Sequence, residues 1–436
     1  MAHPYIPLTD EDRRAMLATV GVASVDDLFA EIPAEHRDPA LDLPPALSEA
    51  ELLRELQELA ARNRSTGELP SFLGAGAYRH YIPSVVDHIL RRGEYLTAYT
   101  PYQPEISQGT LQTIFEFQSL VCELTGMDVA NAGMYDGASA LAEACLMACS
   151  VTGRERIVLL DTVHPHATET VRTYAGGRGL TVEVIPPGPA PLAGDVACLA
   201  AQQPNFFGYL EELASLGRAA HEAGALFAVS ADPVSLGLLR PPADFGADIV
   251  VGEGQPLGVP LSFGGPYVGL FACREQFVRH LPGRIVGRTH DLESRTGYVL
   301  TLQTREQHIR RERATSNICT SQQLVALAFT VALCTLGKQG LRRMAELCYH
   351  KAHYAAERIA ALPGYELPLD GRFFQEFVVR CPRPPAEVNS RLLERGIIGG
   401  YDVSGRIERG LLLCFSELHA REEVDALVKA LGEMAA

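Results

Sequence analysis

Short apolar runs alternate with longer amphipathic segments between about residues 108 and 273. Runs of four to six residues rich in Val, Ile, Leu and Ala are typical of buried strands, and the longer segments have the helical spacing of apolar positions. The predicted strands are Arg156–Leu160, Thr181–Ile185, Val196–Ala200, Leu226–Ser230, Asp248–Val251 and Tyr267–Ala272, with helices at His164–Tyr174 and Tyr209–Ala223. This alternation predicts a large α/β domain with a doubly wound, mostly parallel sheet, whose ligands bind at the carboxyl ends of the strands.

The two flanking regions have different patterns. Thr9, and Ser48 together with Glu51, precede apolar helical segments and are helix-capping signals. After about Gln303 the elements expected are long helices to Leu362, an apolar run at Phe373–Cys381, a helix near Pro385–Arg395, a strand at Leu411–Phe415 and a helix from Glu417. The predicted domains are an N-terminal helical arm at 1–70, a large α/β domain at 71–310 and a smaller C-terminal α+β domain at 311–436.

The charge balance limits the possible partners. The 436 residues include 38 Lys and Arg against 53 Asp and Glu, a net charge of −15. An acidic surface repels phosphate backbones and anionic lipids, so we expect no nucleic-acid and no membrane partner. The longest apolar stretch, Leu324–Leu336, is too short to span a bilayer, and the N-terminus has no basic and apolar leader pattern. We therefore expect a cytoplasmic protein.

Cysteine and lysine usage bear on the chemistry. The ten cysteines stand singly, without a Cys-x-x-Cys pair or a zinc-type spacing with histidine, so we expect neither disulfides nor a metal site. Lysine occurs only at Lys338, Lys351 and Lys429, so no lysine precedes residue 338.

An aspartate ends one of the predicted strands. Asp232 follows Leu226–Ser230, and the next strand is followed by Gln255 and Pro256. In pyridoxal-phosphate enzymes of fold type I, a strand-end aspartate keeps the pyridine nitrogen protonated, and a lysine after the next strand binds the cofactor covalently. This chain has the aspartate without the lysine, and arginine cannot replace a lysine because its guanidinium stays protonated. From these residues alone, Asp232 could equally cap a loop.

Several longer motifs resemble one family. They are Tyr5–Leu8, Phe72–Tyr78 (FLGAGAY), Tyr99–Gly109 (YTPYQPEISQG), Gly246–Ile249, Gly264–Pro266 and Thr304–Thr320 (TREQHIRRERATSNICT). Over nearly its whole length the chain is similar to the P-protein of the glycine cleavage system, the pyridoxal-phosphate-dependent glycine decarboxylase. It resembles in particular the first of the two chains that carry this activity where the enzyme is split.

The resemblance implies a fold type I transferase-like fold and a division of labour between two chains. Single-chain members hold the cofactor lysine only in their second half, so a homologous lysine-bearing subunit 2 should bring it. That partner would carry the pyridoxal phosphate, glycine would be decarboxylated there, and the aminomethyl group would pass to the lipoyl group of H-protein. Asp232, Gln255 and His164 would be degenerate cofactor positions in this chain.

The segment from Tyr95 to Gln108 is suited to reach a neighbouring subunit, because sites of fold type I enzymes lie between subunits and Pro101 and Pro104 favour an extended backbone. The residues predicted to be catalytic are Glu105, Tyr99 and Tyr102, and those predicted to contribute to substrate binding or the interface are Tyr95, Gln103, Ser107 and Gln108. Ser107 is also the expected cap of the following helix. The alternative is an aromatic and proline-rich loop that only packs at an interface.

The turn at Asn131–Ala140 opens a helix, a geometry that can bind phosphate through free N–H groups. Asp136 in this turn is an ordinary N-cap and a poor phosphate neighbour, so we expect a capping role for it and predict that Tyr135 faces the partner's site. His164 follows a strand where these enzymes often place a ring against the cofactor, and a structural histidine is the alternative.

An arginine-rich string follows the large domain. Arg313, with Arg305, Arg310 and Arg311, could bind the glycine carboxylate, the cofactor phosphate or acidic groups of a partner. On a helix, Arg310 and Arg313 would share a face with Glu306, and solvated ion pairs are the alternative. The polar residues Thr315–Asn317 are interpreted as a helix cap.

Two other functions stay open at this point. The chain could be a non-catalytic scaffold or regulatory subunit that retains the fold for assembly. It could also be a self-sufficient pyridoxal-phosphate decarboxylase or aminotransferase, although the position of its three lysines argues against this.

Overall fold

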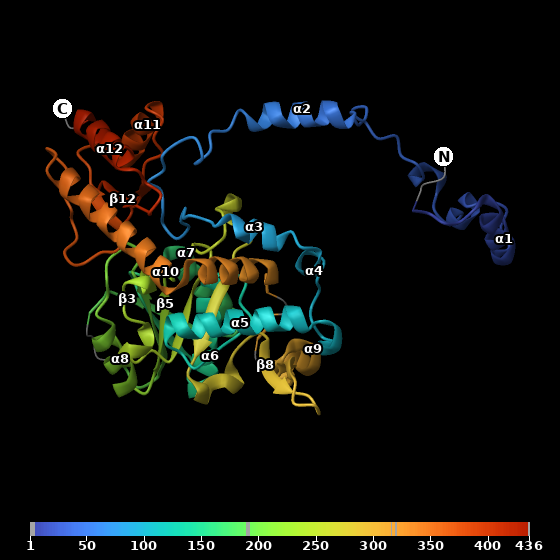
Figure 1. Cartoon of the computed structure of the whole chain (residues 1–436), viewed down its shortest axis with the longest axis horizontal. Helices are drawn as coiled ribbons and strands as arrows, with labels where there is room; N and C mark the ends of the chain where they lie inside the picture. Colours follow the sequence, from blue (N-terminus) through green and yellow to red (C-terminus); the bar gives the residue numbers. More distant parts are fainter. Residues whose placement is uncertain (1–4, 189–191, 315, 319–320, 435–436) are drawn as a thin grey trace. The chain divides into compact units, whose positions relative to one another are not determined.

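The computed structural model describes residues 5–188, 192–314, 316–318 and 321–434. The chain divides into two compact units, Met1–Arg64 and Ser65–Ala436, each described by itself (Figure 1).

The first unit consists of short helices without a core. Helix α1 is capped by Thr9, whose side chain accepts the Asp12 N–H at 3.1 Å, and Ser48 accepts the Glu51 N–H at the start of α2 at 3.4 Å. Both predicted caps are confirmed. The helical elements are α1 (Asp10–Val20), η1 (Asp26–Phe29), η2 (Ala34–His36) and α2 (Glu49–Ala60). No described side chain of this unit is buried, so capping rather than packing stabilises its helices.

A seven-stranded sheet forms the centre of the second unit. Its order is β1-β7-β6-β5-β4-β2-β3, in which β6, β5, β4, β2 and β3 run parallel and β7 is antiparallel to both of its neighbours. The strands are β1 (Val129–Ala130), β2 (Arg156–Leu160), β3 (Thr181–Ile185), β4 (Val196–Gln203), β5 (Leu226–Ala231), β6 (Ile249–Glu253) and β7 (Gly269–Cys273). Each predicted strand of the large domain is therefore found, with ends shifted by up to three residues.

Helices cover this sheet. Helix α6 is buried along most of its length and contacts β4, β5, β6 and β7, while α8 also packs on β4 and β5. The helices are α5 (Gln108–Thr125), α6 (Gly137–Thr152), α7 (Pro165–Gly176) and α8 (Leu213–Glu222). The hairpin of β8 (Ile285–His290) and β9 (Thr296–Thr301), which packs against α5, was not predicted.

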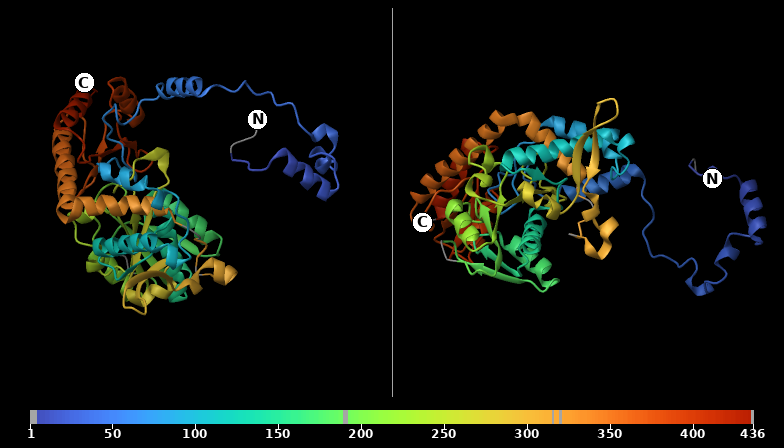
Figure 2. Two further views of the ribbon diagram at one scale, coloured as in Figure 1. Left: turned by 45° about the vertical axis from the view of Figure 1, so that its right-hand side comes forward. Right: turned by 90° about the horizontal axis from the view of Figure 1, so that it is seen from below.

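Helix α10 (Gln323–Ala360) has buried side chains in two apolar clusters of this unit, one around the seven-stranded sheet and one around the smaller C-terminal sheet. Its backbone is interrupted at Gly337, where φ is 59° and ψ is −177°. The first half lies beside α5 and contacts α3 (Ser84–Leu90), and its later part contacts α12 (Figures 1 and 2). By length and composition alone α10 could cross a membrane, but its buried side chains belong to both apolar clusters, which is typical of a core helix.

The C-terminal part has a smaller sheet of order β10-β12-β11. Its elements are β10 (Glu376–Arg380), α11 (Pro385–Glu394), β11 (Tyr401–Asp402), β12 (Gly410–Cys414) and α12 (Arg421–Met434), close to the predicted positions except that α12 begins four residues later. Their side chains form a second apolar cluster with Phe72 and Phe206. The domain boundaries at 70 and 310 stay predictions.

Two segments depart from the expected backbone. The stretch from Pro70 to Gly109 is rich in Gly, Pro and Tyr, and the sequence predicts it to be irregular. It nevertheless contains α3, α4 (Gly93–Leu96) and the 3-10 turn η3 (Pro104–Ile106). The arginine-rich string is not one helix: η8 (Gln303–Arg305), α9 (Gln307–Arg310) and η9 (Arg311–Arg313) are separate turns, and Arg311 has φ 52°. The predicted helical face of Arg310, Arg313 and Glu306 is therefore wrong, because a residue in this conformation ends a right-handed helix.

Candidate functional site

A cavity of about 360 Å³ lies where the parallel strands end. His164 follows β2, Asp232 follows β5 and Glu253 ends β6, and all three line the cavity together with Gly137 in the first turn of α6. The carboxyl ends of neighbouring parallel strands meet at one edge of a sheet, so this is where the topology predicts a ligand.

The first turn of α6 is held by two carboxylates of the chain itself. Asp136 is the N-cap and accepts the Ser139 N–H at 2.7 Å, which confirms its predicted capping role. Glu253 accepts N–H groups from Gly137 at 2.9 Å, Gln255 at 3.0 Å and Val268 at 3.3 Å. Burial raises the pKa of Glu253 to about 7, against the opposing effect of these donors.

Asp232 is held by neutral donors. One of its oxygens accepts the Val234 N–H at 2.9 Å and the other accepts the side-chain amide of Gln375 at 3.2 Å. Burial raises the pKa of the carboxyl, and the nearby charge of His80 opposes this. The aspartate thus caps its own loop, as in the second interpretation of the sequence.

Gln255 and Pro256 are the residues predicted at the position of the cofactor lysine, and Pro256 lines the cavity. Gln255 is the polar one of the two. Its side chain is buried, and its amide donates to the carbonyl oxygens of Tyr78 at 2.8 Å and Val259 at 2.9 Å. Its oxygen accepts the Tyr78 N–H at 2.8 Å. The amide therefore joins two loops at the edge of the cavity and is fully engaged in structural hydrogen bonds.

A second carboxylate reaches the cavity from the smaller sheet. Glu376 on β10 accepts the Ala75 N–H and the Tyr78 hydroxyl, each at 2.7 Å. Burial raises the pKa of Glu376 to about 7, and burial together with the Glu376 charge places the pKa of Tyr78 well above its ordinary value. These bonds fix the loop of Ala75 and Tyr78 over the strand ends.

His164 has its ring nitrogens occupied. Its Nε2 lies 2.9 Å from the Ala75 carbonyl oxygen, and its Nδ1 accepts the His166 N–H at 3.1 Å, so the neutral tautomer carries its proton on Nε2. Burial lowers the pKa of the ring. These contacts are those of a structural histidine, the alternative considered from the sequence.

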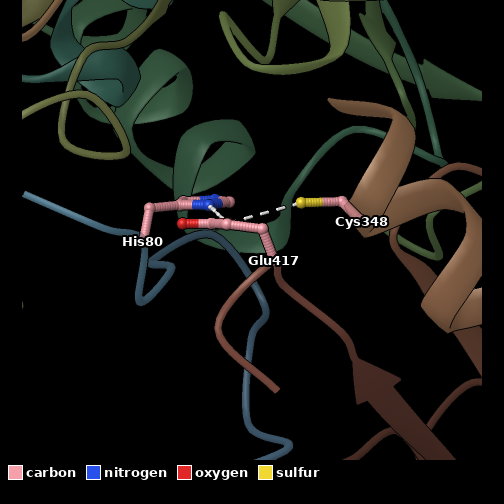
Figure 3. A group of neighbouring side chains, drawn as sticks. All are labelled: His80, Cys348 and Glu417. Atoms are coloured by element: carbon pink, nitrogen blue, oxygen red, sulfur yellow. Dashed lines mark hydrogen bonds and ion pairs between the residues drawn. The ribbon is translucent and has the colours of Figure 1, made fainter. Parts of the chain in front are cut away.

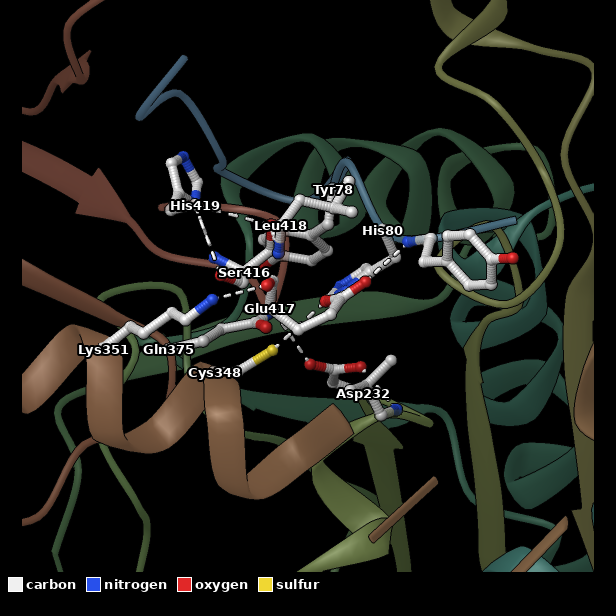
Figure 4. Close-up of polar contacts among 12 residues, drawn as sticks. Tyr78, His80, Asp232, Cys348, Lys351, Gln375, Ser416, Glu417, Leu418 and His419 are labelled. Carbon is white, nitrogen blue, oxygen red and sulfur yellow. Dashed lines mark hydrogen bonds and ion pairs between the residues drawn. The ribbon is translucent and has the colours of Figure 1, made fainter. Parts of the chain in front are cut away.

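A polar cluster lies next to the cavity, between loop, helix and sheet. His80 Nδ1 is 2.6 Å from Glu417 Oε2, the Tyr81 N–H donates to Glu417 Oε1 at 2.6 Å, and Cys348 Sγ lies 3.6 Å from Glu417 Oε2 (Figure 3). Figure 4 shows this cluster beside Asp232 and Gln375. The possible ligand atoms of His80, Cys348 and Glu417 lie within 4.8 Å of one another, but in this arrangement the histidine and the carboxylate are hydrogen-bonded directly to each other.

The lining does not fit pyridoxal phosphate bound by this chain. No lysine or arginine lines the cavity among the described residues, and four carboxylates do: Asp136, Asp232, Glu253 and Glu376. The lysine position holds an amide, and the helix start that would bind a phosphate is occupied by Glu253. We therefore assign no reaction step to a cofactor in this cavity.

The predicted catalytic segment lies outside this cavity. Tyr99 is 82% exposed, and Glu105 is exposed in η3. Tyr102 is anchored instead: Arg284 donates to its hydroxyl at 3.0 Å and has its guanidinium 5.3 Å from the ring centre, and His308 makes an edge contact. The predicted extended backbone is not found throughout the segment: Tyr95 lies in α4, the Tyr102 N–H donates to the Thr100 carbonyl oxygen at 2.9 Å, and Pro104 begins a 3-10 turn.

The remaining residues of this segment differ in their exposure and in their hydrogen bonds. Gln108 donates to the carbonyl oxygens of Pro104 at 2.7 Å and Tyr298 at 2.9 Å, and accepts the Tyr298 N–H at 2.8 Å. Tyr95 is half-buried and Gln103 is exposed. Ser107 occupies the N-cap position of α5, but its side chain makes no capping hydrogen bond, because its backbone, with ψ 21°, is not in the extended conformation of an ordinary N-cap. The capping prediction for Ser107 is wrong.

Tyr135 and Arg313 lie elsewhere. Tyr135 lines a second cavity of about 320 Å³ with Glu143 and Asn317, not the one at the strand ends. Arg313 is exposed. The predicted cap at Thr315–Asn317 falls partly on Thr315, which is outside the described residues, while the Ser316 hydroxyl donates to Glu143 at 2.7 Å.

Sequence reasoning missed Glu253 and Glu376 as site residues. Glu253 lies two residues after the predicted strand Asp248–Val251, as Asp232 lies two residues after Leu226–Ser230, so the same pattern could have identified it. Glu376 lies about 300 positions from Ala75 and Tyr78, and no local pattern connects them.

Comparison with known proteins adds to this geometry. A family model described as "Glycine cleavage system P-protein" matches residues 3–431. A protein of Thermomicrobium roseum named "Probable glycine dehydrogenase (decarboxylating) subunit 1" is 57% identical over 99% of this chain and 100% of its own length. A protein of Geobacillus kaustophilus with the same name is 52% identical over 99% of both chains.

Among solved structures, a glycine decarboxylase (P-protein) of the glycine cleavage system in inhibitor-bound form is 45% identical. Its TM-score is 0.93, and the match covers 99% of this chain and 100% of that chain. A cysteine desulfurase from Thermococcus onnurineus, 18% identical with a TM-score of 0.61 over 85% of this chain and 95% of that chain, shares the fold alone. The predicted fold class, type I of the pyridoxal-phosphate-dependent enzymes, is confirmed.

The buried carboxyls predict a pH dependence of stability. Burial raises the pKa of Glu253 and of Glu376 from 4.5 to about 7, so the folded chain holds protons that the unfolded chain has already released between these values. Stability should therefore fall as pH rises from about 4.5 to about 7. Glu376→Gln should reduce this fall by about 2–3 kcal/mol.

Urea unfolding at pH 5 and pH 8 measures this effect. The matched control is Glu394→Gln, which replaces an exposed carboxyl at the end of α11 and should keep the wild-type pH difference. An unchanged pH difference in Glu376→Gln would show that this carboxyl does not hold an extra proton in the folded state.

Proposed function

The chain belongs to the glycine cleavage system P-protein family as subunit 1 of its two-chain form, and we propose that it completes a glycine-decarboxylating site whose pyridoxal phosphate is held by a partner subunit. The observation that supports this most directly is the cleft without a lysine. Gln255, where the sequence predicts the lysine position, and the four carboxylates in the lining support a lysine amine that another chain supplies to the cofactor. A homologous subunit 2 is the natural source.

In this proposal, pyridoxal phosphate on the partner supplies the electron sink for the loss of carbon dioxide from glycine. The aminomethyl carbon then passes to the lipoyl group of H-protein. This chain contributes side chains and an interface rather than the cofactor site itself.

Exposed apolar side chains support the proposal that this chain forms an interface with a partner subunit. In the second unit, Phe263 and Leu292 are fully exposed, and Ile106 is 77% exposed. Phe263 also has φ 55°, a strained conformation for a residue of its size, which is typical of segments held for contact. Obligate interfaces are apolar and resemble a core cut in half, so these residues fit a permanent partner better than free solvent.

The Tyr95–Gln108 segment is anchored at Tyr102 and at Gln108, which suits a segment that contacts a partner subunit. The side chains of Arg284 and Glu306 are 6% and 7% exposed and form an ion pair at 3.3 Å, and Arg284 also binds Tyr102. Gln108 anchors the other end of the segment on β9. Between these anchors Glu105 projects into solvent, where a partner's cleft could receive it.

We also propose a cytoplasmic location. The cysteines among the described residues are all free thiols, eight of them at least partly buried, which suits a reducing compartment.

The first test of the proposal concerns the isolated chain. Mixed with pyridoxal phosphate and reduced with borohydride, it should retain no cofactor at a specific lysine, because Lys338, Lys351 and Lys429 do not line the cavity. With a co-expressed lysine-bearing chain, peptide mapping should find the cofactor on that partner, and, when lipoylated H-protein is added as the acceptor, labelled glycine should release carbon dioxide. A stoichiometric adduct on this chain that supports decarboxylation would overturn the proposal.

The second test concerns Glu105. A carboxylate at the mouth of the partner's cleft could orient the glycine amine or move protons, work that typically accelerates a reaction by about 10²–10⁴-fold. Glu105→Gln keeps the shape and removes the charge, so it should lower turnover within about that range while the complex and its cofactor content stay intact.

Glu94→Gln is the matched control, since Glu94 is another exposed carboxylate of the same region. Turnover, size-exclusion profile and cofactor absorbance are measured on the same preparations. Normal turnover of Glu105→Gln, or a loss of activity only through dissociation, would leave Glu105 a structural residue and favour the scaffold function.

A further inference from the structure

The carboxylate of Glu253 lies at the N-terminus of α6, where unpaired N–H groups and the helix dipole favour an anion. It accepts three backbone N–H groups, from the first turn of α6, from the loop after β6 and from the residue just before β7. An anion with several backbone donors at a helix start is the arrangement in which proteins bind phosphate. Here the anion is a side chain of the chain itself.

The start of α6 packs directly against Glu253. A Cβ placed on Gly137 would lie 3.0 Å from both the backbone nitrogen and the Cβ of Glu253. The first turn of α6 therefore rests directly on this residue. A phosphate could reach the Gly137 N–H only by displacing the carboxylate.

The rest of the lining opposes an anionic ligand as well. Asp136 caps the same turn, and Asp232 and Glu376 line the same cavity without a described arginine or lysine among their neighbours in the lining. Like charges brought together in a cleft strongly disfavour binding.

We propose that Glu253 excludes phosphorylated cofactor from this chain by taking the place of its phosphate group. The side chain joins α6 to the ends of β6 and β7, the contacts that a phosphate would otherwise make, so the cleft is stable without a ligand. Pyridoxal phosphate is thereby left to the lysine-bearing partner. This inference goes beyond the proposed function and does not depend on decarboxylation, because it concerns binding to this chain by itself.

The test compares three forms of the full chain. Glu253→Ala frees the Gly137 N–H and removes one charge. Glu376→Gln is the matched control, because it removes the same charge from the same cavity without exposing a helix start. The probes are inorganic phosphate and pyridoxal phosphate, with binding measured by isothermal titration calorimetry and equilibrium dialysis at low salt and at pH 8, where both Glu253 and Glu376 are ionised, and folding checked by circular dichroism.

Glu253→Ala should bind both probes at one site per chain, about tenfold or more tighter than the wild-type chain and Glu376→Gln. If the alanine variant does not fold, Glu253→Ser, whose short side chain likewise frees the Gly137 N–H and removes the charge, is judged by the same criterion. Equally tight binding by the wild-type chain, no gain in a folded Glu253 variant, or an equal gain in Glu376→Gln would each overturn the proposal. None of these outcomes bears on glycine turnover in the complex, so the two proposals fail separately.

Discussion

The hydrogen bonds of Glu253 are the interaction on which the cleft of this chain depends. One carboxylate satisfies N–H groups from the first turn of α6, from the loop after β6 and from Val268, and these groups would otherwise lack partners at the edge of the sheet. Unpaired buried donors are costly, so an internal acceptor lets the edge close without a ligand. In the proposed function, a cofactor-binding architecture is thereby retained by a chain that leaves the cofactor to its partner.

The same principle extends around the cavity. Asp136, Asp232 and Glu376 each accept at least one backbone N–H, so each carboxylate stabilises a loop or helix start. Because Glu376 belongs to β10, its bonds also fix the loop at Ala75 and Tyr78 to the smaller sheet. The raised pKa values of Glu253 and Glu376 reflect the burial that this arrangement requires.

In the proposed function, the side chains that this chain contributes to the chemistry lie on an exposed segment rather than in the cavity. The segment from Tyr95 to Gln108 is anchored by the buried Arg284–Glu306 pair and by Gln108, while Tyr99 and Glu105 remain exposed. A segment fixed at its base loses little further freedom when a partner binds, which favours association. In the proposed function, the carboxylate-lined cavity and the exposed Tyr95–Gln108 segment both reflect a division of labour between two chains.

The sequence by itself determined the central strands, the caps at Thr9, Ser48 and Asp136, and the missing lysine at Gln255, because each signal lies within a few neighbouring residues. The family also followed from contiguous motifs. Only the tertiary structure decided that Glu376 meets Tyr78 from 298 positions away, that Arg284 holds Tyr102, and that β8 and β9 pair beside α5. Such contacts depend on how distant segments close onto one another, and local hydrophobic periodicity carries no information about that closure.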